Sequence, residues 1–369
     1  MKKGTVRGYL ANIFDGMAKG LFASLIVGTI ISQIGSLLGN IDNSTIGHIA
    51  LALEQIGQIA QRMMGPAIGA GVAMKIITKE DGTSNLKPFT LLAAVSAGAL
   101  GAGTLRFITN DEGITVLSTF IGDPHGALLA TLIAVELIRR IEGKTKFDLL
   151  IIPALMITIS GAIGQIVTPV ITWTMGHFGE FVVRITDLHT LPMSVLIAVI
   201  IGLTLTLPIV SSAALCIAIG IGIPAEGVTE IGTLAAGAAL AGASAQMVGF
   251  AVTSFRENGV SGLVSQGIGT SMIQFSNIIK NPWVWLPPIV ASAVAGPIAT
   301  VILRMRTTSV GAGMGTSGLV GPLQTFEAMG ASGFLPIIIA CIIVPAAVSL
   351  GLSELMRKYG LIKEGDLKL

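Results

Sequence analysis

Residues 266–283 read QGIGTSMIQFSNIIKNPW, and residues 244–250 shortly before them read SAQMVGF. Both stretches set uncharged polar side chains among glycines and methionines, in a chain of which 52% is hydrophobic. A polar group in apolar surroundings is costly unless it is hydrogen-bonded, so each of these side chains needs a partner. The side chains in question are Gln246, Gln266, Thr270, Ser271, Gln274, Ser276 and Asn277.

The composition is that of a membrane protein. Only 11% of the 369 residues are charged and the mean hydropathy is +0.84, whereas a soluble domain carries about 25% charged residues. The sequence therefore predicts an all-α polytopic membrane protein with about 8–10 transmembrane helices, the first of them uncleaved. Windows that reach the apolar length of a bilayer core lie at 20–39, 88–108, 114–138, 149–175, 191–223 and 336–352.

Positive charges predict the orientation of the chain. Lys and Arg cluster near both termini and at 75–87, 139–146 and 304–306, whereas 41–48 and 110–113 contain none. By the positive-inside rule, both termini and the basic loops are expected in the cytoplasm and the other two loops outside. The second crossing is then expected at about 46–77.

The two halves of the chain differ in regularity, although we expect one transport domain over 1–369. Residues up to about 207 predict regular crossings, interrupted at 178–192 by a charged helix suited to the membrane surface. From about 208 to 357, Gly, Pro and amides break the apolar runs. Non-helical backbone at membrane depth is tolerated only where it is buried in protein or lines a cavity, so this half is expected to hold the binding site in broken or re-entrant segments.

Several function classes are excluded by missing motifs. The sequence contains no phosphate-binding loop of ATP-driven pumps and no Cys or His spacing typical of a metal site, so we expect neither a cofactor nor a metal. Cys216 and Cys341 lie in apolar runs, where a thiol is usually a small buried hydrophobe. The near-neutral net charge of +2 gives no indication of nucleic acid as a partner.

The polar stretches allow two interpretations. Small residues let transmembrane helices approach closely, and Gln or Asn can hydrogen-bond between helices without any ligand. Alternatively, uncharged amides and hydroxyls suit a neutral polyhydroxylated ligand such as a sugar. A similar choice applies to Asn258 in the segment RENG at 256–259, which is either a simple turn or the tip of a re-entrant hairpin near the substrate.

The second half resembles the enzyme IIC component of the bacterial sugar phosphotransferase system, in the branch that contains regulators of the perfringolysin-regulator type. The similar segments are LTLPIVSSAAL at 205–215, residues 234–288 and GAGMGTSGLVGP at 311–322, which includes Thr316; GDPHGALLATLIAVELIRR at 122–140 is similar as well. The resemblance implies a bacterial plasma-membrane permease, usually a homodimer in lipid, that binds a sugar and presents a hydroxyl to a phosphorylated IIB domain, which receives its phosphoryl group from a IIA domain. Neither of these soluble domains is found here, so the chain is not expected to be catalytic alone.

Two further residues are candidate sugar contacts, the first of them through the resemblance. Residues 227–230 are similar to a short motif whose glutamate contacts sugar in other IIC groups, which suggests Glu230, unless this segment is a solvated loop. His125 follows the helix-start pair Asp123 and Pro124, and it either bonds a sugar hydroxyl or lies at the interface. We also expect Glu136 to pair with Arg139 or Arg140 at the membrane boundary.

Two rival functions stay open at this point. The first is a membrane sensor that binds a ligand and regulates transcription through a partner, as the regulators in the similar branch suggest. The second is an ion-coupled carrier of a non-sugar solute, which requires an ionisable residue in the membrane interior. The carboxylates available for that role are Glu54, Glu136, Glu230 and Glu327.

Overall fold

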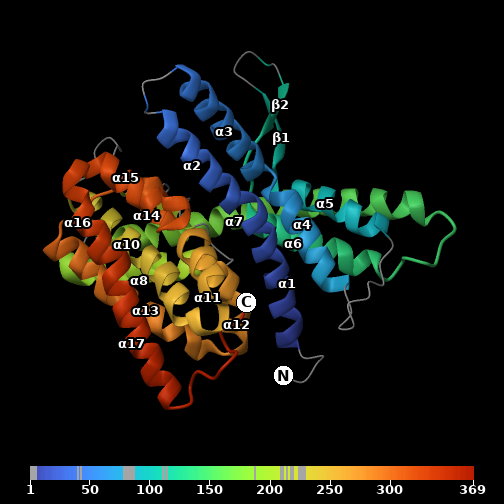
Figure 1. Ribbon diagram of the computed structural model, residues 1–369. Helices are drawn as coiled ribbons and strands as arrows, with labels where there is room; N and C mark the ends of the chain where they lie inside the picture. The colour runs from blue at the N-terminus through green and yellow to red at the C-terminus, as the bar shows by residue number, and fades with distance from the viewer. Residues whose placement is uncertain are drawn as a thin grey trace. The chain divides into compact units, whose positions relative to one another are not determined.

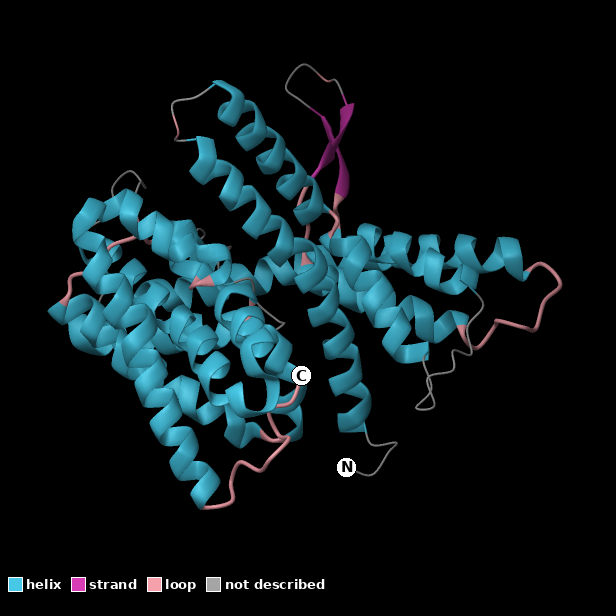
Figure 2. Cartoon of the chain, viewed as in Figure 1, coloured by secondary structure: helices cyan, strands magenta, loops and turns pink. Residues whose placement is uncertain are grey.

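The computed structural model describes residues 6–39, 41, 44–77, 88–109, 113, 115–186, 188–207, 212, 215–216, 220–222 and 230–369. The chain divides into two compact units, Met1–Thr172 and Trp173–Leu369, and each is considered by itself. Helices dominate both units (Figures 1 and 2). The prediction of an all-α polytopic membrane protein is confirmed.

Unit 1 consists of helices joined by close small-residue contacts. Its helices are α1 (Val6–Leu21), α2 (Val27–Gly39), α3 (Ser44–Arg62), α4 (Met64–Ile77), α5 (Pro88–Ala102), α6 (Pro124–Ile138) and the start of α7 (Asp148–Thr186). A π-helical turn, Phe22–Ile26, joins α1 to α2 without ending the helix. A Cβ atom at Gly16 of α1 would lie 2.4 Å from the carbonyl oxygen of Gly71 in α4, so the two backbones touch because neither residue has a side chain.

A β-hairpin interrupts the helices of unit 1, as Figure 2 shows in magenta. Strands β1 (Leu105–Thr109) and β2 (Thr115–Thr119) pair antiparallel, with Phe107 opposite Leu117. The interpretation of 88–108 and 114–138 as two uninterrupted helical crossings was therefore wrong. Both strands are rich in β-branched residues, and Gly113 between them has a φ of +78°, which favours a hairpin over helix.

Unit 2 is organised around α10 (Glu230–Thr253). In the span 232–253, 94% of the helix is buried. Helices α8 (Thr190–Thr206), α13 (Leu286–Pro297), α14 (Ser309–Met314) and α17 (Val344–Lys358) pack against it. A Cβ at Gly242 of α10 would lie 1.9 Å from the carbonyl oxygen of Ala198 in α8, which explains why this helix is so rich in Gly and Ala.

The rest of unit 2 is a series of short, broken helices, as the composition of this half predicts. One series comprises α11 (Phe255–Val264), a π-helical turn η2 (Ser265–Gly269), a 3-10 turn η3 (Ser271–Gln274), α12 (Phe275–Lys280) and a 3-10 turn η4 (Pro282–Trp285). The others are η5 (Ile298–Ile302), η6 (Ser317–Leu319), α15 (Val320–Met329), η7 (Gly330–Gly333), α16 (Phe334–Pro336) and η8 (Ile337–Ile343).

Three predicted boundaries need correction. The segment 178–192 is not a separate surface helix, because α7 continues through it to Thr186. The second crossing divides at Met63 into α3 and α4, since Gly65 and Pro66 follow immediately. The RENG segment is helical, and its break lies at Gly259, whose φ of +57° only glycine adopts readily.

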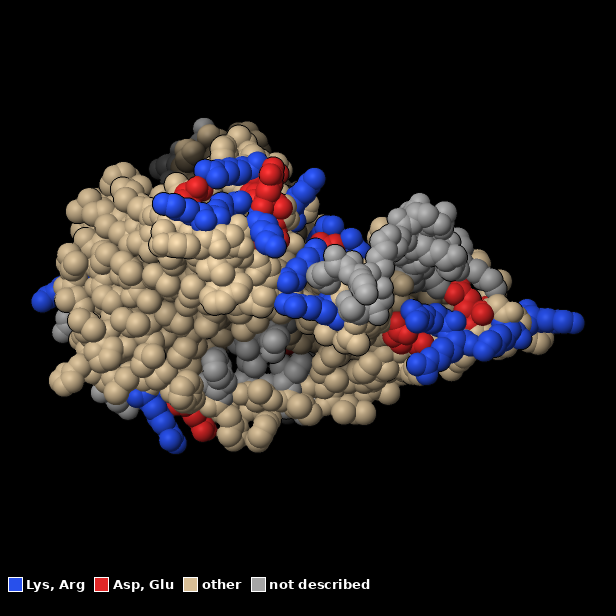
Figure 3. Space-filling view, turned by 90° about the horizontal axis from the view of Figure 1, so that it is seen from below, with Lys and Arg blue, Asp and Glu red and all other residues tan. Residues whose placement is uncertain are grey.

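Five helices within the described residues are long and apolar enough to cross a membrane: 6–39, 148–167, 232–253, 282–302 and 317–358. Four shorter apolar helices accompany them, at 64–76, 89–102, 124–138 and 190–206. Figure 3 shows why lipid suits this surface, since Lys, Arg, Asp and Glu form small patches on an otherwise uncharged face. Cys216 and Cys341 are completely buried.

Candidate functional site

A buried glutamine on α10 forms hydrogen bonds with three other elements of unit 2. Gln246 is completely buried, and its Oε1 accepts hydrogen bonds from Trp285 Nε1 at 2.8 Å and from Thr206 Oγ1 at 3.2 Å. Its Nε2 donates to Ser292 Oγ at 3.1 Å. One side chain thus joins α8, α10, α13 and η4. Among the described residues, one acceptor is found for the two amide hydrogens of Gln246.

The first broken segment, residues 255–285, comes close to Gln246 at Ser271. Ser271 is completely buried, and its Oγ lies 2.8 Å from Thr206 Oγ1. Thr270, in extended backbone before η3, accepts from the Met272 amide and so caps that short helix. Ser271 and Gln246 therefore share the hydroxyl of Thr206.

The second broken segment, residues 309–329, contacts the first at Thr316. Thr316 Oγ1 donates to the carbonyl oxygen of Gly267 at 2.5 Å, and Met247 Sδ lies 3.5 Å from the same hydroxyl. A Cβ at Gly315, whose φ is +57°, would lie 2.9 Å from the backbone of Ala243 in α10. The loop comes this close because residue 315 is glycine. The neighbouring Ser317 Oγ is buried and has no partner among the described residues.

Three amides form a chain of hydrogen bonds next to this junction. Gln274 Nε2 donates to Gln266 Oε1 at 2.9 Å, and Asn277 Nδ2 donates to Gln274 Oε1 at 2.7 Å. Gln266 Nε2 in turn donates to Ser254 Oγ at 2.7 Å. All three amides are almost completely buried. We call Gln266, Gln274 and Asn277 the amide chain.

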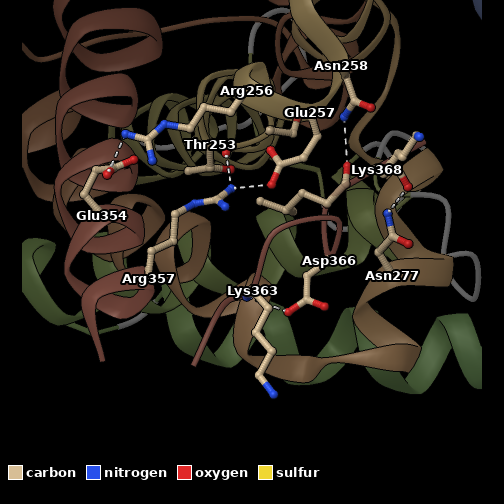
Figure 4. A network of polar contacts seen from close by, with 12 residues as sticks. Thr253, Arg256, Glu257, Asn258, Asn277, Glu354, Arg357, Lys363, Asp366 and Lys368 are labelled. Carbon is tan, nitrogen blue, oxygen red and sulfur yellow. Dashed lines mark hydrogen bonds and ion pairs between the residues drawn. The ribbon is translucent and has the colours of Figure 1, made fainter. Parts of the chain in front are cut away.

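The amide chain and Asn258 also hold the end of the polypeptide. Asn258 Nδ2 donates to Leu367 O at 2.8 Å, and Asn277 Nδ2 donates to Lys368 O at 2.9 Å, as Figure 4 shows. Beside these contacts, Arg357 Nη2 lies 2.8 Å from Glu257 Oε1, and both side chains are partly buried. Neither interpretation of the RENG segment anticipated that Asn258 binds residues near 369.

The structure therefore brings together most of the residues that sequence reasoning selected. Gln246, Gln266, Thr270, Ser271, Gln274, Asn277 and Thr316 all belong to one buried polar region of unit 2. Sequence reasoning missed Thr206, Trp285 and Ser292, which bond Gln246. Serines, threonines and tryptophans are common in membrane helices, so only the tertiary contacts distinguish these three.

Two further predicted residues belong to other elements of the chain. His125 belongs to unit 1, where the ring Nδ1 lies 3.0 Å from Asp123 Oδ1 and the buried Nε2 has no partner among the described residues. Asp123 Oδ1 also accepts from the backbone amides of His125 and Gly126, so it caps α6. Burial acts to raise the pKa of Asp123, but these hydrogen bonds outweigh it and the pKa lies below its ordinary value. Glu230 begins α10, and residues 227–229 of its motif lie outside the described residues.

The remaining carboxylates proposed for ion coupling have polar neighbours. Glu136 accepts from the Tyr9 hydroxyl and lies 3.1 Å from Arg139 Nε, so the predicted pairing with Arg139 is confirmed. Glu54 accepts from Gln58, and Glu327 accepts from Gln324 at an exposed position. Within the described residues, no group of three or more His, Cys, Asp or Glu side chains could hold a metal ion.

The family model of the phosphotransferase system EIIC matches residues 11–369. The chain belongs to this EIIC family. It is accordingly a multi-pass membrane permease for a sugar or similar small polar solute, and IIA and IIB proteins are its separate partners in the phosphotransferase system. The sensor and the ion-coupled carrier are not favoured.

Other comparisons add little to this assignment. No curated protein matches the chain. Among solved structures, this EIIC protein is similar to the transporter ChbC, the IIC component from the N,N'-diacetylchitobiose-specific phosphotransferase system. The sequence identity is 14%, the TM-score is 0.43, and the match covers 97% of each chain.

Proposed function

We propose that the sugar binds in unit 2, at the junction where two broken segments meet the middle of α10. The observation that carries the proposal is the contact of Thr316 with the carbonyl of Gly267, which joins irregular backbone from two distant parts of the sequence, the turn at Thr316 and the π-helical turn η2. Such backbone inside a membrane protein is stable only where protein or a polar ligand satisfies it. The side chains proposed to contact the sugar are Gln246, Gln266, Thr270, Ser271, Gln274, Asn277 and Thr316.

The chemistry of the junction favours a neutral ligand. Its buried side chains are amides and hydroxyls, which both donate and accept hydrogen bonds as sugar hydroxyls do. Arg357 and Glu257 are paired with each other, and Lys280 Nζ donates to Asn277 Oδ1 at 3.4 Å. Gln246 retains a donor and Ser317 a hydroxyl for the ligand. His125, Glu230 and Asn258 are proposed as further sugar contacts.

The transport cycle follows from the proposed site. A sugar enclosed between α10 and the broken segments is released to either side when these segments shift, which is alternating access. A hydroxyl presented on the cytoplasmic side then takes a phosphoryl group from the separate IIB protein, which is recharged by IIA. This chain binds and orients the sugar, and its partners supply the phosphoryl chemistry.

Four assignments complete the proposal. The chain acts as one transport domain in the bacterial plasma membrane, with both termini in the cytoplasm, as the distribution of Lys and Arg favours. It works as a homodimer in contact with lipid, since many of its large apolar side chains are exposed, among them Leu92 in α5 and Ile302 in η5.

The test is a thermal-shift screen of the purified full chain against glucose, N-acetylglucosamine, cellobiose and maltose. A ligand that binds only the folded state stabilises it by RT ln(1 + [L]/Kd), about 2.7 kcal/mol at 100 times Kd. Thr316→Val should weaken binding of the best sugar by roughly 5- to 150-fold, because a buried hydrogen bond to a ligand is worth about 1–3 kcal/mol.

Thr300→Val provides a matched control. Thr300 is equally buried in unit 2, but its hydroxyl bonds the carbonyl of Gly296 within its own helix. This variant should leave the affinity unchanged. Equal sugar affinity of both variants and the wild type would show that Thr316 does not contact the sugar. A screen in which no sugar stabilises the protein would refute the proposed binding region.

A further inference from the structure

The last residues of the chain form a strap on unit 2. After α17 the backbone turns, the Leu361 amide donating to Met356 O at 3.0 Å, and residues 361–369 lie against α11 and α12. We call residues 361–369 the C-terminal strap. Ile362 is 2% exposed and Leu367 is fully buried, so two apolar side chains anchor it. Short internal bonds, such as Asp366 N to Lys363 O, keep it compact.

Side-chain amides hold the strap at both ends. Asn281 Nδ2 donates to Leu361 O at 2.9 Å and to Asp366 Oδ2 at 2.8 Å. At the other end, Asn258 binds both the carbonyl of Leu367 and the amide of Leu369, the latter at 3.0 Å. Three of these four contacts are made by the backbone of the strap, through the carbonyls of Leu361 and Leu367 and the amide of Leu369.

Docking of the strap uses up the donors of the amide chain. Gln274 Nε2 donates to Gln266 and to Leu367 O, both at 2.9 Å, and an amide nitrogen has only two hydrogens. Asn277 Nδ2 likewise donates to Gln274 and to Lys368 O. A sugar hydroxyl can therefore accept from Gln274 or Asn277 only after these two carbonyls of the strap have left.

The surroundings permit the strap to leave without the helices. A polar cavity of about 630 Å³ is lined by Arg256, Glu257 and Arg357 on one side and by Glu364, Gly365 and Lys368 of the strap on the other. Arg357 is held by Glu257 of α11 and by the carbonyl of Thr253 at the end of α10, and neither contact involves the strap (Figure 4). Release of the strap then breaks its own bonds and leaves α17 in place.

We propose that the C-terminal strap is an internal competitor of the sugar, which occupies the amide donors of Gln274 and Asn277 and must undock before these residues bind substrate. The inference rests on the proposed function, because it concerns the same amides. The strap then acts as a latch on the empty transporter. Docking of the strap weakens sugar binding, and sugar binding weakens docking of the strap to the same extent.

The test releases the strap and measures sugar binding. Leu367→Asp should undock it, since Leu367 is fully buried, whereas Leu369→Asp should not, since Leu369 is 48% exposed and its contact with Asn258 is made by the backbone. Undocking is read from faster hydrogen exchange of the amides in 361–369, and binding from titration with the sugars of the screen. A second variant that ends at Gly360 lacks the strap altogether.

Release of the strap should tighten binding of the best sugar by at least about fivefold. This factor corresponds to one hydrogen bond between the amides and the strap that the sugar no longer has to break. The sugar should also speed exchange of 361–369 in the wild type. A released strap with unchanged or weaker binding would overturn the latch and leave the proposed function standing. If no sugar binds to any of the four proteins, the proposed binding region fails and the latch with it.

Discussion

Replacing Gln246 with leucine tests the centre of unit 2 most directly. The side chain makes three hydrogen bonds to other elements, to Thr206, Trp285 and Ser292. Polar contacts between membrane helices average about 0.6 kcal/mol each, so the loss of three predicts a destabilisation of about 2 kcal/mol. Leucine conserves most of the volume, so the cost comes from the missing amide and not from a cavity.

The partners left behind are unequally affected. Thr206 keeps its contact with Ser271, and Ser292 keeps the carbonyls of Gly242 and Pro288. The indole of Trp285 keeps no acceptor among the described residues. A fully buried donor without a partner costs about 1–3 kcal/mol, and Trp285 is partly buried, so combining the change at 246 with Trp285→Phe should restore about 1 kcal/mol of stability.

Unfolding in one fixed detergent measures these free energies, and titration with the best sugar measures affinity on the same samples. Gln165→Leu is the control, because Gln165 is exposed on α7. Affinity of the variant at 246 should fall by roughly 5- to 150-fold. A loss of stability with unchanged affinity would show that Gln246 only fastens helices. Stability within about 0.5 kcal/mol of the wild type would refute the hydrogen-bond network itself.

Three further predictions are independent of the sugar. A cysteine placed at Lys144 should be labelled by an impermeant maleimide only from the cytoplasmic side, and one placed at Asn43 only from the outer side. Labelling of both from the same side would overturn the orientation. Gly242→Ala should cost about 1–3 kcal/mol in unfolding free energy because its Cβ meets a carbonyl of α8, whereas Gly161→Ala, with open space around it, should be neutral or stabilising; equal effects would contradict the close helix contact. Asp123→Ala should lower the free energy of unfolding by about 1 kcal/mol at neutral pH, because the helix cap is lost. Folding lowers the pKa of Asp123, so the advantage of the wild type should vanish as pH falls below about 3.9 and through that lowered pKa. A difference in stability that persists in acid would refute the cap.

Much of the architecture could be predicted from composition and local pattern. The membrane class follows from apolar length, since a bilayer accepts only chains that satisfy their own backbone. The broken second half and the burial of Cys216 and Cys341 follow from the same local rules. The hairpin at 105–119 was missed because hydropathy averages over a window and cannot separate a β-branched strand from the end of an apolar helix.

Residue type and spacing are enough to show that this chain crosses a membrane, that its second half is irregular, and that uncharged polar residues gather there. Which of those residues meet depends on the tertiary structure. Gln246 bonds Thr206 across 40 positions, and Gln274 bonds the carbonyl of Leu367 across 93. Hydrogen bonds between distant segments depend on how helices pack, and no local pattern encodes their partners, so the strap and the junction at Thr316 could not have been derived from the sequence.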